Sequence, residues 1–355
     1  MQPIDESVLT PFGWKEVGLL NVGDKVCNPD GTVSEIVVLS GIQTLPTNTL
    51  KFHDSTQTQA GPEHLWNVWV ARDSRKIGNI EVGGEASAQV ITTGMIANVL
   101  ARGKKPLIPV TKEVAFNVTR RWKCGMDPYL LGLILGDGHI HDPIRHGDST
   151  GITSDDHEHI IQYLDLIGAD YRIGEKCGTT ACSYCFRNEF HAKVKDQLRR
   201  VKLLGTKSGT KFIPDEYKMG TVDVRYALVC GLMDTDGYVD ERGQVYYCTT
   251  SPQLSEDMAF VLRSLGAVVT VYKKDTGENH ALAYEHYIKH RNPEKLFKLP
   301  RKRDRVIVGR TDVMFKRVDC IQISDPVPMR SLKVNNPNGL YITRDFILTH
   351  NSLLS

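Results

Sequence analysis

The chain has 355 residues, of which 41% are hydrophobic and 24% charged, and its formal net charge is +2. This length is enough for two domains that each bury a core of their own. It contains no apolar run long enough to span a membrane, and its acidic first residues lack the apolar core of a secretory signal. We therefore expect a cytoplasmic protein with reduced cysteines and no membrane partner.

The distribution of turn signals and apolar residues divides the chain into three parts. Residues 1 to about 115 predict short β-strands, because turn signals such as Asn28-Pro29-Asp30-Gly31 punctuate the apolar stretches. From about residue 125, helix-length apolar segments alternate with strand-like segments, and short strands return after about residue 310. This order predicts that the two ends fold together as one domain and that the middle is an inserted second domain.

The middle contains two similar segments, residues 130–138 and 229–237, which are apolar and end in Asp-Gly. Both predict helices, and in each helix two small residues stand four apart, so two backbones can approach closely. Packed side by side, these helices would bring Asp137 and Asp236 together at their C-terminal ends. A single Asp-Gly would be only a helix stop, but two copies in the same order of elements favour a shared site. The small residues are Gly132, Gly136, Gly231 and Thr235.

Two carboxylates beside helix C-termini suit a hard divalent cation, which can activate water and stabilise a leaving oxygen in phosphodiester hydrolysis. We therefore expect Asp137 and Asp236, with the neighbouring Gly136 and Thr235, to form a metal site. The expected ion is Mg²⁺.

Residues 125–305 resemble the LAGLIDADG homing endonucleases. Beyond the repeated helix, Lys211-Phe212-Ile213-Pro214 is similar to the family's Lys-x-Ile-Pro block. The resemblance implies an α+β domain with pseudo-twofold αββαββ repeats that grips double-stranded DNA and cuts both strands. It also implies that Lys211 lies near the scissile phosphate, although a surface lysine is the alternative. A second such lysine would be Lys273 or Lys274, and the sequence does not choose between them.

The C-terminal end carries Thr349-His350-Asn351-Ser352. The Asn351 side-chain amide can attack the main-chain carbonyl of the same residue, which closes a succinimide and cuts the chain after Asn351. His350 can polarise that carbonyl or protonate the departing amine. The hydroxyl of Ser352 can carry an ester before this cut. Alone, a His-Asn-Ser sequence would be an ordinary polar loop.

Residues 8–26 resemble the opening of the Hint domain that inteins share with hedgehog autoprocessing domains. Residues 61–66 are similar to the intein block whose histidine, here His64, assists cleavage of the upstream peptide bond. The order of opening block, His64 block, endonuclease and closing His-Asn-Ser is that of inteins, and hedgehog-type domains lack the closing His-Asn. The resemblance therefore implies an all-β, horseshoe-like splicing domain that needs no cofactor.

The first residue departs from the common intein pattern, because Met1 cannot serve as the usual Cys or Ser nucleophile. A minority, the class 3 inteins, use a Trp-Cys-Thr set instead, and Trp66 and Thr349 match two of its positions. At the third position, the internal nucleophile, this chain has Ser331, whose hydroxyl is a weaker nucleophile than a thiol. Ser331 is either natural or a replacement that stalls a precursor. A class 1 intein whose first Cys was replaced by Met1 also stays open.

The resemblances together predict the domain boundaries. Residues 1–120 and 308–351 would form the Hint splicing domain, 121–307 the LAGLIDADG endonuclease, and 352–355 the start of the downstream extein. The expected activities are autocatalytic splicing and site-specific cleavage of double-stranded DNA, with an endonuclease that only binds DNA as the alternative. The expected protein is a monomer. Its host would be a P-loop ATPase, such as a phage terminase or a replicative helicase.

Two further groups of residues, one basic and one rich in cysteine, could bind phosphate or metal. Basic residues crowd one stretch near the end of the middle part and can supply phosphate contacts or form a solvated face. A single Cys182-x-x-Cys185, with Cys177 and His191 nearby, is at zinc-ligand spacing but falls where the endonuclease should have strands, so we expect no zinc site. The basic residues are Lys295, Lys298, Arg301, Lys302, Arg303, Arg305 and Arg310.

Overall fold

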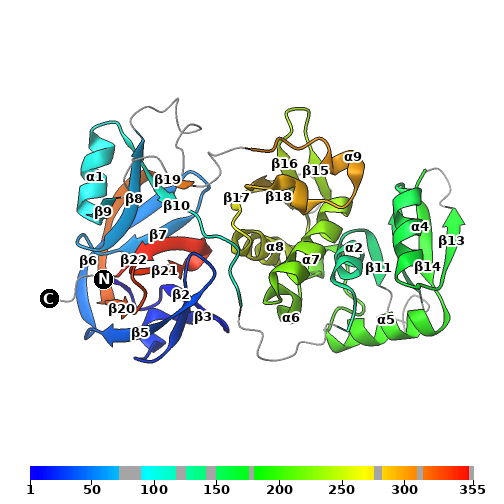
Figure 1. Cartoon of the computed structure of the whole chain (residues 1–355), viewed down its shortest axis with the longest axis horizontal. Helices are drawn as coiled ribbons and strands as arrows, with labels where there is room; N and C mark the ends of the chain where they lie inside the picture. The colour runs from blue at the N-terminus through cyan, green and yellow to red at the C-terminus, as the bar shows by residue number, and fades with distance from the viewer. Residues whose placement is uncertain are drawn as a thin grey trace.

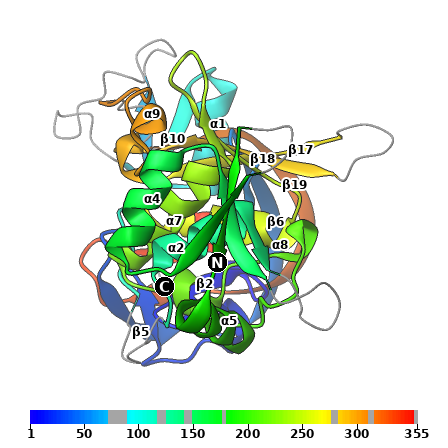
Figure 2. The same ribbon diagram turned by 90° about the vertical axis from the view of Figure 1, so that its right-hand side faces the viewer.

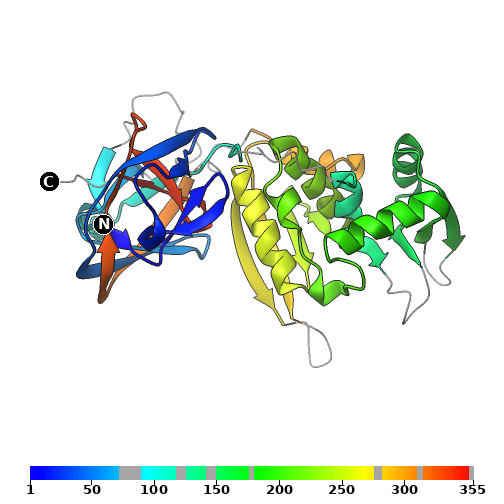
Figure 3. The same cartoon turned by 90° about the horizontal axis from the view of Figure 1, so that it is seen from below.

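A computed structural model of the chain describes residues 1–71, 89–116, 125–140, 149–175, 180–275, 282–309 and 315–351. Two lobes lie side by side (Figures 1 and 3). One lobe is built almost entirely of strands from both ends of the chain, and the other holds most of the helices. The expected mixed architecture, an all-β domain with an inserted α+β domain, is confirmed. No helix in the described ranges is long and apolar enough to cross a membrane.

The all-β lobe joins N-terminal and C-terminal strands in shared antiparallel sheets. The long strand β19 pairs with β6, β10 and β1, and β21 pairs with β2, so the last strands lie among the first ones (Figure 1). The N-terminal elements are β1 (Gln2–Pro3), β2 (Ser7–Thr10), β3 (Gly13–Glu16), η1 (Val17–Leu19), β4 (Lys25–Cys27), β5 (Val33–Leu39), β6 (Gln43–Phe52), β7 (Gln57–Ala60), β8 (Leu65–Ala71), β9 (Gln89–Thr92), α1 (Thr93–Ala101) and β10 (Lys105–Pro109). The C-terminal elements are β19 (Phe315–Arg330), β20 (Leu332–Val334), β21 (Leu340–Thr343), η6 (Arg344–Phe346) and β22 (Ile347–His350).

The inserted lobe repeats one motif, a helix followed by two strands, a helix, and two more strands. The two four-stranded sheets have the same order, β11-β12-β14-β13 and β15-β16-β18-β17. Figure 2 looks onto the end of this lobe, with α4 and α5 beside the strands of the first repeat. The first repeat is α2 (Pro128–Asp137), β11 (Gly138–Ile140), β12 (Thr150–Ser154), α4 (His157–Leu166), β13 (Tyr171–Glu175), β14 (Cys182–Phe186) and α5 (Asn188–Arg200). The second is α7 (Val222–Thr235), β15 (Gly237–Val239), β16 (Val245–Thr249), α8 (Pro252–Ser264), β17 (Val268–Lys274) and β18 (Ala283–Lys289).

Short helical turns connect and close the repeats. Between them lie η3 (Ser208–Thr210) and α6 (Asp215–Lys218), and the second repeat is followed by η4 (Pro293–Leu296) and α9 (Pro300–Arg303). One apolar core runs through both repeats, whereas the all-β lobe has two smaller cores. The inserted lobe is therefore a single unit organised around the pair of helices α2 and α7.

Candidate functional site

Helices α2 and α7 touch through their backbones. A Cβ added to Gly132 would lie 2.4 Å from the carbonyl oxygen of Leu228, and one added to Gly231 would lie 2.4 Å from that of Tyr129. Neither backbone atom can rotate away, so only glycine fits at the two positions. The close approach predicted from the four-residue spacing is confirmed.

This packing places the two acidic residues at the same end of the helix pair. Asp137 is the last residue of α2 and is exposed, whereas Asp236 caps α7 and is half-buried. Burial and, next to it, the Asp137 carboxylate raise the pKa of Asp236 to about 7, against the opposing effect of Lys211 and Lys302. The two carboxylates therefore act on one another, as like charges in one site do.

Two buried lysines hold the C-terminal ends of these helices. The Nζ of Lys211 donates to the carbonyls of Ile134, Gly136 and Gly138 at 2.9, 3.0 and 2.9 Å. All three of its N–H donors are thereby used, and the residue is only 4% exposed. Burial lowers the pKa of Lys211 to about 8, while Asp236 and Asp137 act to raise it. Lys211 thus stands beside both carboxylates as a helix cap, and its place near the scissile phosphate stays a prediction.

The second repeat has its own version of this lysine, which the sequence did not reveal. The Nζ of Lys302 donates to carbonyls of the last turn of α7 and of Gly237, at 2.7 to 3.0 Å. Neither Lys273 nor Lys274 takes this place, and Lys274 is paired with Glu285 on β18. Lys302 is only 7% exposed, so its side chain fits neither of the two alternatives considered for the basic stretch, a phosphate contact or a solvated face.

The oxygen atoms at this end of the helices fit a divalent cation. The described residues contain no group of three or more His, Cys, Asp or Glu side chains able to hold a metal. Mg²⁺ needs fewer, because it is commonly held by one or two carboxylates and completes its shell with water and substrate phosphate oxygens. Asp137 and Asp236 can supply the carboxylates. The carbonyls of Gly136 and Thr235 each already accept a lysine hydrogen bond.

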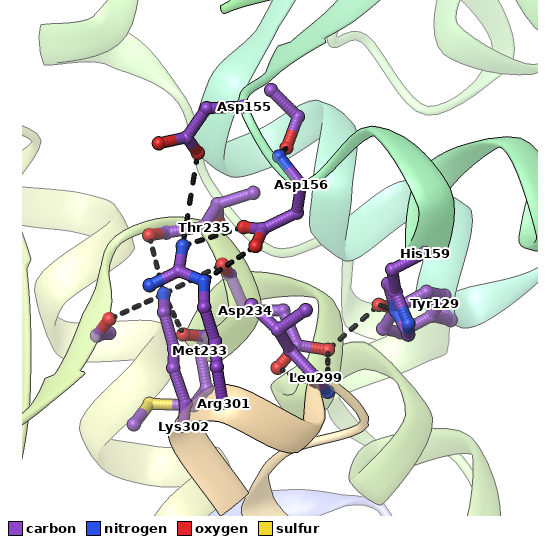
Figure 4. A network of polar contacts seen from close by, with 12 residues as sticks. Tyr129, Asp155, Asp156, His159, Met233, Asp234, Thr235, Leu299, Arg301 and Lys302 are labelled. Carbon is purple, nitrogen blue, oxygen red and sulfur yellow. Dashed lines mark hydrogen bonds and ion pairs between the residues drawn. The ribbon is translucent and has the colours of Figure 1, made fainter. Parts of the chain in front are cut away.

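A buried acid that the sequence analysis did not single out, Asp234, joins the two repeats (Figure 4). It accepts a hydrogen bond from the Tyr129 hydroxyl at 2.7 Å and others from the backbone N–H groups of Lys298 and Leu299. Arg301 adds an ion pair to Asp156 across the same boundary, with 2.5 Å between Nε and Oδ1. Of the described basic residues in this stretch, Lys302 is buried, whereas Arg301 is exposed and pairs with Asp156 at the surface. Arg310 lies outside the described residues.

The second site lies in the all-β lobe around His64, which is fully buried. Its Nδ1 is 3.3 Å from the amino nitrogen of Met1, and its Nε2 is hydrogen-bonded to the hydroxyl of Thr349 on β22. Burial lowers the pKa of His64 well below its ordinary range, and the Met1 amine and His350 lower it further. One neutral imidazole therefore connects the first residue of the chain to its last strand.

Trp66 packs against the ring of His64. Its ring is fully buried, meets the His64 ring edge-on at 4.9 Å between centroids, and donates from Nε1 to the Thr93 hydroxyl at 2.9 Å. Thr93 begins α1 and donates its own backbone N–H to the His64 carbonyl. This chain of contacts fixes the orientation of the imidazole. The sequence pointed to Trp66 and Thr349 but not to Thr93.

Asn351 is held on both sides of its Cα. Its backbone N–H donates to the Gly339 carbonyl at 2.7 Å, and its side-chain Oδ1 accepts from the Val334 N–H at 2.9 Å. The Nδ1 of His350 lies 2.8 Å from the Asn351 carbonyl oxygen, where an imidazole N–H can polarise that carbonyl. Ser352 lies outside the described residues.

Ser331 lies between β19 and β20 and is 3% exposed. Its backbone is tied to Ser40 in both directions, at 3.0 and 3.1 Å. In the pairing of β1 with β19, Gln2 faces Arg330 and Pro3 faces Met329. Met1 directly precedes β1 and Ser331 directly follows β19, so both residues lie just beyond the paired ends of these strands.

The cysteine group considered for zinc is spread over different elements. Cys182 and Cys185 both lie on β14, where residues three apart point to opposite faces of the sheet. The nearby His191 is on α5, and Cys177 lies outside the described residues.

Comparison with known proteins supports both parts of this picture. Residues 223–299 match the LAGLIDADG-like domain family. Over 368 residues the chain is 28% identical to the replicative DNA helicase DnaB of Mycobacterium intracellulare, a match that covers 99% of this chain and 58% of that protein. The chain thus spans little more than half the length of its relative.

Two solved structures are similar to this chain. The MchDnaB-1 intein is 10% identical, with 99% of this chain and 100% of that chain covered and a TM-score of 0.29. I-DmoI in complex with DNA and Mn is 18% identical, with 47% and 90% covered and a TM-score of 0.32. A LAGLIDADG-like domain thus lies between the two halves of an all-β domain, which is the order of domains that the sequence resemblance to inteins implies.

Proposed function

We propose that the chain excises itself by protein splicing and that its inserted domain cuts double-stranded DNA at a specific site. The contact that carries the splicing proposal is His64, which meets both the Met1 amine and Thr349. In an unspliced precursor the nitrogen of Met1 belongs to the upstream peptide bond. His64 is therefore placed to deliver a proton to that nitrogen when the bond breaks.

The nucleophile that we propose for this step is Ser331. Its Oγ attacks the carbonyl carbon before Met1, a C–O bond forms, and the C–N bond to Met1 breaks as the amine takes up a proton. The resulting ester passes to the Ser352 hydroxyl. Asn351 then attacks its own carbonyl, and the amine of Ser352 leaves with the upstream segment attached. The pairing of Gln2 with Arg330 supports Ser331, because Met1 and Ser331 are the next residues beyond this pair.

Substitutions at Ser331 and Met1 separate the two classes of mechanism. With both flanks restored, Ser331→Cys should splice faster than the wild type, because a thiolate is the better nucleophile. Ser331→Ala should abolish the branched intermediate. If Met1→Cys combined with Ser331→Ala restored splicing, while Ser331→Cys alone produced none, the class 1 mechanism would hold instead.

For the inserted domain we propose hydrolysis of the phosphodiester backbone at Asp137 and Asp236. A divalent cation held there would activate water and stabilise the leaving oxygen. The chain orients the two carboxylates through the glycine contact of α2 with α7 and through the caps Lys211 and Lys302. Both repeats lie on one chain, so a monomer suffices for a pair of cuts.

The proposed host is a replicative helicase, and the similarity to a DnaB helicase over 99% of this chain favours this host over a phage terminase. The test is cleavage of a helicase gene that lacks the insertion, with Mg²⁺ and with Mn²⁺, by the wild type and by Asp137→Asn and Asp236→Asn. Cutting by the wild type alone supports the proposal. Binding without cutting by the wild type in either metal would mean that the domain only binds DNA.

A further inference from the structure

The turn before the last strand holds an unfavourable backbone conformation. Asp345 and Phe346 have φ angles of 59° and 57°, and neither is glycine. Two adjacent side chains in the left-handed region are rare and persist only where the surroundings hold them. This turn opens directly into β22, which carries Thr349 and leads to Asn351.

Both lobes hold this turn. From the all-β lobe, the Nζ of Lys316 donates to the Asp345 carbonyl at 3.0 Å. From the inserted lobe, the guanidinium of Arg263 on α8 forms an ion pair with the Asp345 carboxylate. Phe260, also on α8, packs edge-on against Phe346 at 5.2 Å between centroids.

The end of helix α8 is anchored where it meets the all-β lobe. The carbonyl of Ser264 accepts hydrogen bonds from the Val114 N–H at 2.9 Å and from the buried Arg225 at 3.0 Å. A cleft of about 1060 Å³ separates the lobes beside this contact, lined by residues of α6, α8 and the β2–β3 hairpin. Packing between the lobes is therefore discontinuous. Arg263 and Asp345 both line this cleft. Helix α8 lies on the side of the inserted lobe that faces the all-β lobe (Figure 3).

We propose that Arg263, a residue of the inserted domain, is a positioning residue for the cut after Asn351. It acts by holding Asp345 in the turn that delivers β22. This inference rests on the proposed splicing function. The reaction it supports closes a bond from the Asn351 side-chain nitrogen to the carbonyl carbon of the same residue and breaks the C–N bond to Ser352, whose nitrogen leaves with the proton. A strand delivered about 1 Å out of place can slow such a step about 100-fold.

The test follows release of the segment that begins at Ser352 from the full chain, by mass spectrometry over time. Arg263→Ala should release it at least about tenfold more slowly, since one anchor of the turn is lost. Arg263→Lys should retain part of the rate, because a shorter, single donor replaces the guanidinium. Arg303→Ala is the matched control, because Arg303 is an exposed arginine of the same lobe that pairs only with its neighbour Asp304 among the described residues.

A rescue separates positioning from a general loss of stability. Asp345→Gly accepts a positive φ without strain, so adding it to Arg263→Ala should return the rate to within about threefold of the wild type. Thermal unfolding of each variant is measured in parallel. A merely structural role for Arg263 predicts that the double variant stays as slow and as unstable as the single one.

The outcomes bear on different claims. If Arg263→Ala releases the segment as fast as the wild type does, or if Asp345→Gly fails to restore the rate, the positioning role is overturned. If the wild type itself releases nothing while the Asn351→Ala control is equally silent, the proposed splicing function fails, whatever Arg263 does. Slow release by Arg263→Ala with rescue by Asp345→Gly supports the inference.

Discussion

Replacing Gly132 by alanine tests whether the backbone contact of α2 with α7 places the two acidic residues. The new methyl group would lie 2.4 Å from the Leu228 carbonyl oxygen, whereas ordinary contacts begin at 3.4 Å, so the helices must separate by about 1 Å. Overpacking of this kind costs about 1–3 kcal/mol, and the better helix propensity of alanine offsets about 1 kcal/mol of it. We expect the inserted domain to lose up to about 2 kcal/mol of stability and about 100-fold in DNA cleavage.

The assay compares cleavage rates in Mg²⁺ and thermal unfolding of Gly132→Ala with those of Gly209→Ala. Gly209 is the matched control because a Cβ there meets nothing within 4 Å. A loss of about 2 kcal/mol corresponds to a fall in Tm of a few degrees for a domain of this size. Gly132→Ala with wild-type cleavage and an unchanged or higher Tm would show that the helices are not held as described.

Three further predictions follow from the buried polar groups. Asp137→Asn should lower the pKa of Asp236 from about 7, because a like charge is removed. A carboxyl NMR titration without metal measures this pKa, and an unchanged pKa would contradict the prediction. Asp54→Asn strands the buried Lys316 and should cost about 3–5 kcal/mol in urea unfolding at pH 7. Burial alone would raise the pKa of Asp54, but Lys316 and Thr56 lower it from 3.8 to about 2. The stabilisation is therefore present above about pH 4 and is lost as the pH falls towards 2. Equal stability of Asp54→Asn and the wild type at pH 7 would refute this prediction. Trp66→Phe removes the hydrogen bond to Thr93 and should slow cleavage at the upstream junction about tenfold, with an unchanged rate as the contrary result.

The helix pair was predictable because its information is local. Four-residue spacing of small residues and a terminal Asp-Gly mark a helix that packs closely and then stops, and α2 and α7 do so. The proposed splicing residues could be named for a different reason, since His64, Trp66 and Thr349 stand in blocks that resemble a known family. Their contacts with one another rest on pairings across 285 residues, which no local pattern contains.

The features that the sequence did not reveal depend on long-range contacts. In the sequence, Lys302 is one of many basic residues. Its role as a helix cap depends on a hydrogen bond to the last turn of α7, which the sequence does not show. Arg301 pairs with Asp156, which lies 145 residues away in the sequence. Helix α5 escaped notice because it buries only Val194 and Leu198 along an otherwise polar stretch. Met1 could be excluded as a nucleophile, but its amine could not be placed beside His64.

Splicing through an internal nucleophile at residue 331 can be followed by mass spectrometry of the chain expressed between both flanking segments, with Ser331→Cys and Ser331→Ala compared side by side. We predict an excised chain ending in a succinimide at Asn351 together with joined flanks for Ser331→Cys, and neither product for Ser331→Ala. Intact precursor from both variants, or equal amounts of joined flanks from both, would contradict the account.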